Sequence, residues 1–597
     1  MSKQWILRTH DVQLIQSIER EANVSPALAQ ILALRGVSNA LEVDRFLSLK
    51  MTGLHEPADL PGVVRATEII LQAIADRKRI VIYGDYDCDG MTATAILVRC
   101  LELLEANVHY FIPNRCDDGY GLNTDALKRQ MDLGTDLFIS VDCGIASVNE
   151  VAFVKQAGKQ IIVTDHHQYG EQLPDADALI HPSLPGSQYP FTGLCGAGVA
   201  FKLAWGLCQR HHGSAKLPPH LRDFLFNAIS LAAIGTVADV VPLLGENRII
   251  VHHGLNCLRM FANPGLKHLL KLTKSADKAT LESEDLGFAL CPRLNAAGRL
   301  GQAQLGVELL ICKSEERGQQ LAEYIDELNK NRETLDRRIL KSARQQILDN
   351  FDPQTDPAFV LSDQDWHPGV IGIVAGRLAE AYNRPTILIA TDPMGKRPAV
   401  GSCRSACGVD VYQALVNCNE FLLRSGGHPA AAGLTIEPDR VDAFRAAFCE
   451  EVASQIGDAD PSDDLWIDAE TLLGHLTLTT MDQINRLAPF GECNPRPVLC
   501  ASAVELAAPP RPIGDGKHLA MSLKQHNCTL RAVAFGKSDW LPELSSENQA
   551  FDFAFYPVIN QFRGFKSVEL QLIDFRPAKV VAQQTVMHAE PRSGDST

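Results

Sequence analysis

The 597-residue sequence lacks several features that would place it in common functional classes. Its longest apolar run, residues 228–244, is interrupted by Asp239, which argues against a membrane span. Its first residues have neither the apolar core nor the cleavage site of a secretory signal. Its 16 cysteines include no C-x-x-C pair, so a zinc site or disulfide framework is not expected. We therefore expect no membrane association and a cytoplasmic location.

Basic charge is also scarce. The chain has 56 Lys and Arg against 72 Asp and Glu, a net charge of −16. Proteins that coat nucleic acid through its phosphates are usually basic, so a non-specific coating role is disfavoured. The acidic total is still compatible with one basic groove, or with carboxylates that hold metal ions. At this length we expect about three or four domains.

An aspartate-rich stretch follows the first strongly apolar segment. Residues 80–82 indicate a buried strand, and Asp85, Asp87 and Asp89 come after it at every second position. On an extended segment these side chains lie on one side and repel one another unless a cation neutralises them. Oxygen ligands of this kind suit Mg²⁺ or Mn²⁺. Taken alone, the stretch fits equally well a turn whose aspartates cap backbone amides.

Between residues 79 and 242, short apolar runs alternate with helix-length segments. This alternation predicts an α/β fold with a parallel sheet covered by helices on both faces. Ligands of such sheets bind beyond the carboxyl ends of the strands. Polar clusters stand at those ends or close an apolar segment: Asp85, Asp87 and Asp89; Asp142; Asp165, His166 and His167; and Asp239. A lone aspartate there is usually a helix cap, but four clusters together favour a metal site.

The residue types in these clusters indicate phosphoryl chemistry. Five carboxylates and a histidine suffice for two divalent ions that share a bridging carboxylate and promote in-line displacement. His166 is a natural ligand through one ring nitrogen, with Asp165 or a backbone group orienting it. His167 can contact the phosphoryl group instead. The alternative is a core histidine hydrogen-bonded to an aspartate.

The same motifs resemble those of the DHH phosphoesterase superfamily. They are Asp85-x-Asp87-x-Asp89-Gly90, Val141-Asp142-x-Gly144-Ile145, Asp165-His166-His167 and Gly235-Thr236-Val237-Ala238-Asp239. Further matches at residues 113–115, 118–121, 292–299 and 366–373 resemble its single-strand-specific 5′-to-3′ exonucleases. The resemblance implies two α/β lobes, DHH and DHHA1, joined by a long helix and followed by an OB-type β-barrel.

The predicted division of the chain follows from this resemblance and from local patterns. We expect a helical N-terminal region (1–75), a DHH catalytic domain (76–300), a long connector helix (301–352), a DHHA1 substrate-binding domain (353–460), an OB-fold nucleic-acid-binding domain (461–577) and a disordered tail (578–597). Apolar residues at three- to four-residue spacing predict the connector. Five alternating segments between 498 and 575 predict the barrel, which either binds single strands or only braces the core.

The resemblance also implies roles for individual residues. Metal ligands match Asp87, Asp89, Asp142, His166 and Asp239, with Asp142 bridging two Mn²⁺ or Mg²⁺ ions and Asp85 as a ligand or a supporting residue. His167 matches the histidine that meets the scissile phosphate, and Asp165 stands beside it as a further catalytic residue. Substrate-binding positions match Arg115, Arg299, Ser402 and Arg404 for the 5′ phosphate and His428 near the metals, with Gly427 as a further substrate-binding residue. From the residues alone, the glycine-rich segments 401–405 and 425–433 are either phosphate-binding backbone or tight turns.

The function implied is a metal-dependent 5′-to-3′ exonuclease that degrades single-stranded DNA to 5′-mononucleotides in DNA repair and recombination. A single-strand-binding protein and a helicase are partners by resemblance only. The alternatives are a phosphodiesterase for short oligoribonucleotides or cyclic dinucleotides, and an inactive single-strand-binding scaffold. Cys88, Cys143, Cys291 and Cys403 stand where the family usually has Ala, Asn, Gly and Gly. We expect activity to survive, with sensitivity to oxidation if Cys88 and Cys143 are exposed.

Overall fold

The structure is a computed structural model that describes residues 3–578, except for 9–10, 115–120, 262, 274, 277, 279, 457–463 and 546–548. Contacts divide the chain into two compact units. One unit holds residues 49–461 and 489–495, and the other holds residues 1–48, 462–488 and the chain from 496 onward. The disordered tail predicted for residues 578–597 lies outside the described residues, apart from Ala578.

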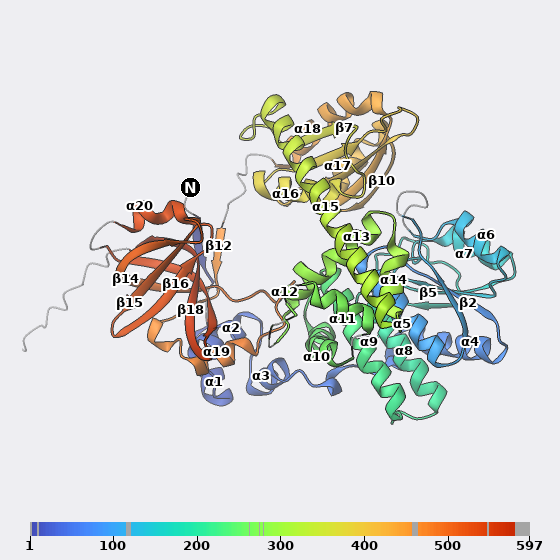
Figure 1. Cartoon of the computed structure of the whole chain (residues 1–597), viewed down its shortest axis with the longest axis horizontal. Helices are drawn as coiled ribbons and strands as arrows, with labels where there is room; N and C mark the ends of the chain where they lie inside the picture. The colour runs from blue at the N-terminus through green and yellow to red at the C-terminus, as the bar shows by residue number, and fades with distance from the viewer. Residues whose placement is uncertain are drawn as a thin grey trace, which may run out of the picture. The chain divides into compact units, whose positions relative to one another are not determined.

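The DHH lobe is built on a five-stranded parallel sheet (Figure 1). Its strands, in spatial order, are β3 (Asn107–Phe111), β2 (Arg79–Tyr83), β4 (Leu137–Val141), β5 (Gln160–Thr164) and β6 (Ala178–Ile180). Successive strand residues face opposite sides, and both sides are buried. Ile80 and Ile82 share one core with α5, α8 and α9, whereas Val81 and Tyr83 share another with α6 and α7. The predicted α/β fold with both faces covered is confirmed.

The helices of this lobe fill both cores. They are α4 (Val63–Ala75), α5 (Cys88–Leu103), α6 (Thr124–Asp132), α7 (Val148–Gln156), α8 (Gly196–His212), α9 (Pro219–Ala238), α10 (Gly245–Phe261), α11 (Pro264–Lys271), α12 (Ser283–Asp285), the π-helical turn η3 (Leu286–Leu290) and α13 (Cys291–Arg299). Among the described residues, α9 alone is long and apolar enough to cross a membrane, and 61% of its apolar window is buried in the lobe. Its apolar character is therefore explained by core packing.

A buried ion pair crosses the helical layer. The ammonium of Lys202, on α8, lies 2.5 Å from the carboxylate of Glu246, on α10, and both side chains are almost completely enclosed. Lys202 also donates to the carbonyl of His55, whose own N–H donates to Glu246. The Tyr189 hydroxyl donates to the same carboxylate. Burial lowers the pKa of Lys202, although the nearby Glu246 opposes this shift.

Replacing Lys202 by methionine is expected to destabilise the fold severely. The substitution leaves the Glu246 carboxylate buried without its cation, which costs about 3–5 kcal/mol in comparable cases. Chemical denaturation of the Lys202→Met variant measures this loss. The exposed Lys313, which pairs with Glu102 at 2.8 Å, provides the control. Lys313→Met should change stability by less than about 1 kcal/mol, and a similar loss in both variants would contradict this account.

The connector and the DHHA1 lobe follow. The connector helix predicted over residues 301–352 is interrupted, because α14 (Ala303–Ile311) ends before Ser314 caps a 36-residue helix, α15 (Glu315–Asn350). The second sheet has the order β10 (Leu422–His428), β11 (Ala431–Ile436), β9 (Ala399–Arg404), β8 (Thr386–Ala390) and β7 (Phe359–Asp363). Only β7 and β8 are parallel to each other. Helices α16 (Ile371–Tyr382), α17 (Val411–Asn417) and α18 (Val441–Ile456) complete the lobe.

The other unit contains the predicted barrel. Strands β14 (Leu499–Ile513), β15 (His518–Gln525), β16 (Cys528–Ala534), β18 (Phe565–Pro577) and β17 (Phe551–Phe562) pair in that order, and β17 pairs back with β14. Five strands therefore close into a barrel, with Phe551, Phe553 and Phe555 buried inside it. Further elements of this unit are β12 (Asp464–Ile467), β13 (Ala469–Glu470), α19 (Leu478–Asn485) and α20 (Leu541–Leu544).

The N-terminal region predicted as one segment, 1–75, is divided between the two units. Strand β1 (Gln4–Leu7) pairs in parallel with β12, and α1 (Val12–Ala22), α2 (Pro26–Leu34) and α3 (Ala40–Leu47) belong to the barrel unit. Residues 49–75 belong to the other unit, where α4 packs against α8. Strand pairing between segments more than 450 residues apart is not visible in local sequence patterns.

Candidate metal centre

The aspartate-rich stretch combines a helix cap with a cluster of acidic side chains. Asp87 is the N-cap of α5, and one of its oxygens accepts the N–H of Gly90 at 2.9 Å. Asp85 and Asp89 are almost fully buried. Gly90 is required here because an added Cβ would lie 2.6 Å from the Cβ of Asp85. The turn and the metal hypotheses are thus compatible, since Asp87 caps the helix and still faces the cluster.

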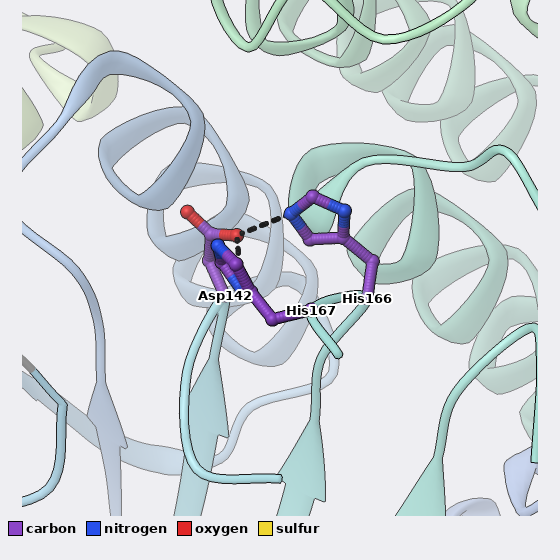
Figure 2. A group of neighbouring side chains, drawn as sticks. All are labelled: Asp142, His166 and His167. Atoms are coloured by element: carbon purple, nitrogen blue, oxygen red, sulfur yellow. Dashed lines mark ion pairs between the residues drawn. The ribbon is translucent and has the colours of Figure 1, made fainter. Parts of the chain in front are cut away.

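Asp142 lies at the centre of the cluster, directly after β4. Its φ of 61° is left-handed, an uncommon conformation for a residue other than glycine. Its Oδ1 lies 3.1 Å from Nε2 of His166 and 4.0 Å from Nδ1 of His167 (Figure 2). Gly196 allows this proximity, because a Cβ there would lie 2.5 Å from the same oxygen. The carboxylate is therefore enclosed by two histidines and the start of α8.

Asp239 reaches the cluster from a helix end. It is the C-cap of α9, so the apolar segment that it closes in the sequence is a helix. Nε2 of His166 lies 3.5 Å from Oδ2 of Asp239 and 3.9 Å from Oδ2 of Asp89. His166 thus faces three carboxylates from three separate segments.

The acidic and histidine side chains form three overlapping groups. Within each group, the potential ligand atoms lie within 4.8 Å of one another. The groups are Asp85, Asp87 and Asp142; Asp89, His166 and Asp239; and Asp142, His166 and His167. All six residues predicted as metal ligands belong to them. Asp142 and His166 each occur in two groups, so they connect one end of the cluster to the other.

The electrostatics of this cluster fit divalent cations. Burial and the charge of neighbouring carboxylates, Asp89 first among them, raise the pKa of Asp142 well above its usual range. The same causes raise the pKa of Asp89 to about 6 and that of Asp239 to about 9. Burial lowers the pKa of His166 to about 3, which keeps its ring neutral and able to coordinate. Among the described residues, Asp142 Oδ1 and His166 Nε2 have no hydrogen-bond partner.

His167 differs from its neighbour because it forms a close pair with Asp165. Its Nδ1 lies 2.7 Å from Oδ1 of Asp165, which also accepts the N–H groups of both histidines. Burial opposes a charge on His167, but Asp165 outweighs it and raises the pKa of the histidine to about 9. Burial likewise opposes ionisation of Asp165, yet His167 lowers its pKa to about 2. The carboxylate therefore orients the ring of His167, whereas the sequence suggested that it would orient His166.

Sequence reasoning missed the residues that hold this cluster in place. Both oxygens of Asp89 accept N–H groups at the start of α8, from Gly196 at 2.7 Å and Ala197 at 2.9 Å. Asn295, on α13, accepts the N–H of Cys88 at 2.9 Å. Gly298 lets the same helix approach, because a Cβ there would lie 2.0 Å from the carbonyl of Tyr86. Asn295 and Gly298 belong to the motif at residues 292–299. The sequence showed this motif only as a family resemblance, without a role for either residue.

Three of the predicted substrate-binding residues, Arg299, Ser402 and Arg404, lie around the start of α16. Arg299 donates to the carbonyl of Gly369 at 3.3 Å. Arg404 donates to Ser402 Oγ at 3.0 Å, and a Cβ at Gly372 would lie within about 3.0 Å of both side chains. Both arginines thus contact the segment of residues 369–372. Arg115 lies outside the described residues.

The glycine-rich segments of the DHHA1 lobe are strands. Residues 401–404 belong to β9, and residues 425–428 belong to β10. The sequence was compatible with phosphate-binding backbone or with tight turns in these segments. His428 and Arg404 both face Ala431 of β11 in the strand register. Gly427 has a φ of 146°, and a Cβ there would lie 2.5 Å from the carbonyl of Ala431. Arg404, Gly427 and His428 are therefore grouped at one end of this sheet.

The unusual cysteines are buried. Cys88, Cys143, Cys291 and Cys403 are at most about 2% exposed. Burial raises the pKa of the Cys143 thiol and that of Cys403. The condition on which oxidation sensitivity depended, exposure of Cys88 and Cys143, is not met.

Comparison with known protein families assigns the three parts of the chain. Residues 79–229 match the DHH family N-terminal domain, 355–454 match the DHHA1 domain, and 467–574 match the RecJ OB domain. Single-stranded-DNA-specific exonuclease RecJ of Dickeya dadantii is 36% identical over 91% of this chain and 94% of its own length. The chain belongs to the RecJ family.

Other RecJ proteins agree with this assignment. The Escherichia coli protein is 32% identical and is covered over its whole length, whereas the chain covers 66% of the Bacillus subtilis protein, to which it is 37% identical. The crystal structure of RecJ in complex with Mn²⁺ from Thermus thermophilus superposes with a TM-score of 0.80 and 32% identity. That match covers 96% of this chain and 80% of the Thermus chain. The predicted two-lobe architecture with an OB domain is confirmed.

Proposed function

We propose that this protein is a metal-dependent exonuclease that degrades single-stranded DNA from its 5′ end to 5′-mononucleotides. The observation that carries the proposal is the overlap of the three acidic and histidine groups at Asp142 and His166. Curated relatives are named single-stranded-DNA-specific exonucleases, and RecJ structures from Thermus contain Mn²⁺ or Mg²⁺. DNA repair and recombination are the processes in which such an activity would be used.

The residues present fit two divalent ions. Asp85, Asp87 and Asp142 would hold one, and Asp89, His166 and Asp239 would hold the other, and the 3.1 Å distance between Asp142 Oδ1 and His166 Nε2 links the two sets. Two bound ions would neutralise this cluster, acidify a water molecule and stabilise charge on phosphoryl oxygens. Hard oxygen donors with a single imidazole suit Mg²⁺ and Mn²⁺ alike.

The side chains around the cluster supply the rest of the chemistry. His167, held protonated by Asp165, would donate a hydrogen bond to a non-bridging oxygen of the scissile phosphate, where negative charge increases during displacement. The N–H groups of Gly196 and Ala197 hold Asp89 in place, so its orientation does not depend on solvent. Asn295 and Gly298 fix the loop that carries Asp87.

The DHHA1 lobe would hold the 5′ end. Arg299 and the pair of Arg404 and Ser402 contact the start of α16, where guanidinium groups and N–H donors suit a terminal phosphate. Arg115, Gly427 and His428 complete the proposed substrate-binding set. Holding the terminal phosphate in this way would make cleavage proceed from the 5′ end.

Replacing Arg404 by glutamine is therefore expected to weaken recognition of the 5′ phosphate. A hydrogen bond to a charged group contributes about 1.5–3 kcal/mol, so kcat/KM on 5′-phosphorylated single strands should fall about 10- to 150-fold. The value on 5′-hydroxyl strands should change much less. The exposed Arg397 of the same lobe provides the control, and Arg397→Gln should affect neither substrate. Equal losses on both substrates would contradict a role at the terminal phosphate.

A single-strand-binding protein, a helicase and a cytoplasmic location remain part of the proposal. The first two rest on family resemblance alone. Pull-down of the full chain with a single-strand-binding protein, with and without DNA, tests the first partnership directly.

A further inference from the structure

A cavity of about 430 Å³ is lined by the residues at the end of α9, the helix that Asp239 caps. Val237, Ala238 and Val240 form one wall, and these residues flank Asp239 at the end of α9. Phe288 forms part of another wall, and Ile373, from the first turn of α16, contributes from the DHHA1 lobe. The cavity therefore extends from the neighbours of a proposed metal ligand to the helix start proposed to hold the 5′ phosphate.

Phe288 is the most unusual residue of this cavity. It is 85% exposed, although its neighbours Leu286 and Leu290 are buried. It belongs to the π-helical turn η3, a conformation that is rare and often found at functional sites. Val240, which also lines the cavity, is 63% exposed and has a φ of 59°, a strained value for a β-branched side chain. Two exposed apolar side chains thus line the cavity, Phe288 on a rare π-helical turn and Val240 on a strained backbone.

The charges of the cavity do not favour a phosphate. Arg299 and Arg332 line it, but so do Glu284 and Glu492. Arg332 is also satisfied within α15, where it donates to Asn329 at 2.6 Å and lies 3.4 Å from Asp336. The formal charges of the four lining side chains cancel, and the remaining walls are largely apolar. A flat, uncharged and aromatic group fits this environment better than an anion does.

We propose that the cavity is a nucleobase subsite, in which the base of a nucleotide adjacent to the scissile phosphate stacks on Phe288. The inference rests on the proposed exonuclease function, because the occupant is part of the single-stranded substrate. Stacking on an aromatic ring tolerates every base, which suits an enzyme that must process any sequence. A base held there would position the following phosphate toward the cluster next to Asp239.

The test compares Phe288→Ala, Phe288→Leu and Phe288→Tyr on two 5′-phosphorylated single strands. One strand is unmodified, and the other has consecutive abasic residues at its 5′ end. On the unmodified strand, Phe288→Ala and Phe288→Leu should lower kcat/KM about 5- to 150-fold, the range expected for one base–aromatic stack, and Phe288→Tyr should retain most activity. On the abasic strand, the kcat/KM values of the wild type and Phe288→Ala should differ less than threefold, which corresponds to about 0.6 kcal/mol.

Equal losses on both strands, or full activity of Phe288→Leu, would overturn the proposal. The exposed Leu133 of the same lobe provides the control, because Leu133→Ala should process both strands like the wild type. A second readout uses a strand with 2-aminopurine near its 5′ end. Stacking on Phe288 should quench the fluorescence of this base when the strand binds Asp142→Ala, but not when it binds Asp142→Ala/Phe288→Ala. A wild-type protein that degrades neither strand would refute the exonuclease function itself, which distinguishes that failure from failure of the subsite.

Discussion

Asp142→Ala is expected to abolish nuclease activity while leaving the protein folded. Asp142 belongs to the group with Asp85 and Asp87, and its Oδ1 lies 3.1 Å from Nε2 of His166 in the other proposed ion site, so its removal should affect both sites. Activity on single-stranded DNA should fall by at least about 10³-fold, because metal-activated water and charge stabilisation are lost together. Release of mononucleotides in the presence of Mn²⁺ measures the effect.

The stability of this variant follows from the sign of the pKa shift. The pKa of Asp142 is raised in the metal-free fold, mainly by burial and then by Asp89. Any stability linked to this group is present below its unfolded pKa and is lost as the pH rises toward the folded pKa. At neutral pH the buried carboxyl group therefore makes the metal-free fold less stable, and Asp142→Ala should melt at the wild-type temperature or above it.

The control for this variant lies at the opposite edge of the same sheet. Asp177 accepts the N–H of Ile161 at 2.8 Å and pairs with Lys155. Asp177→Asn should keep its nuclease activity. Retained turnover in Asp142→Ala, or unfolding of that variant at neutral pH, would contradict the role assigned to Asp142.

His166→Ala is expected to remove one of two bound ions. His166 belongs to the group with Asp89 and Asp239, but not to the group of Asp85, Asp87 and Asp142. Even outer-shell partners of metal ligands change affinity about 10- to 100-fold, so loss of a direct ligand should weaken one ion by at least about 100-fold. Titration of the metal-free protein with Mn²⁺, followed by electron paramagnetic resonance, should show about two sites in the wild type and about one here.

The outcome for His167→Ala distinguishes the proposed role of His167 from that of His166. His167 is paired with Asp165 and is expected to act on the phosphate, so its variant should lose activity but still bind about two ions. Loss of an ion in His167→Ala, or two tight ions in His166→Ala, would contradict these assignments.

The sequence predicted well those site residues that follow the strands of the DHH sheet, because the signals for buried strands are local. Buried strands end at Tyr83, Val141 and Thr164, and parallel strands bring their carboxyl ends to one edge. Asp85, Asp142 and His166 are positioned by that rule alone. Asp239 was also expected at the site, but it comes from a helix, since a fully buried helix and a buried strand both appear as continuous apolar runs.

What could not be predicted depends on tertiary contacts. Nothing in the local pattern shows that Asn295 accepts the N–H of Cys88, or that α8 donates two N–H groups to Asp89, because these residues are more than 100 positions apart. The pairing of Asp165 with His167 is decided by side-chain direction. The exposure of Phe288 could not be predicted either, because an apolar residue in an apolar segment is normally assigned to the core.

Degradation of end-labelled DNA tests the central claim most directly. Single- and double-stranded DNA of about 20 nucleotides, labelled at the 5′ or the 3′ end, would be incubated with the full chain, with and without Mn²⁺, beside a dinucleotide. The account predicts that the single strand releases its 5′ label first as a mononucleotide, only with metal, and faster than the dinucleotide or duplex is cut. Release of the 3′ label first, internal fragments, faster dinucleotide cleavage or metal-independent turnover would contradict it.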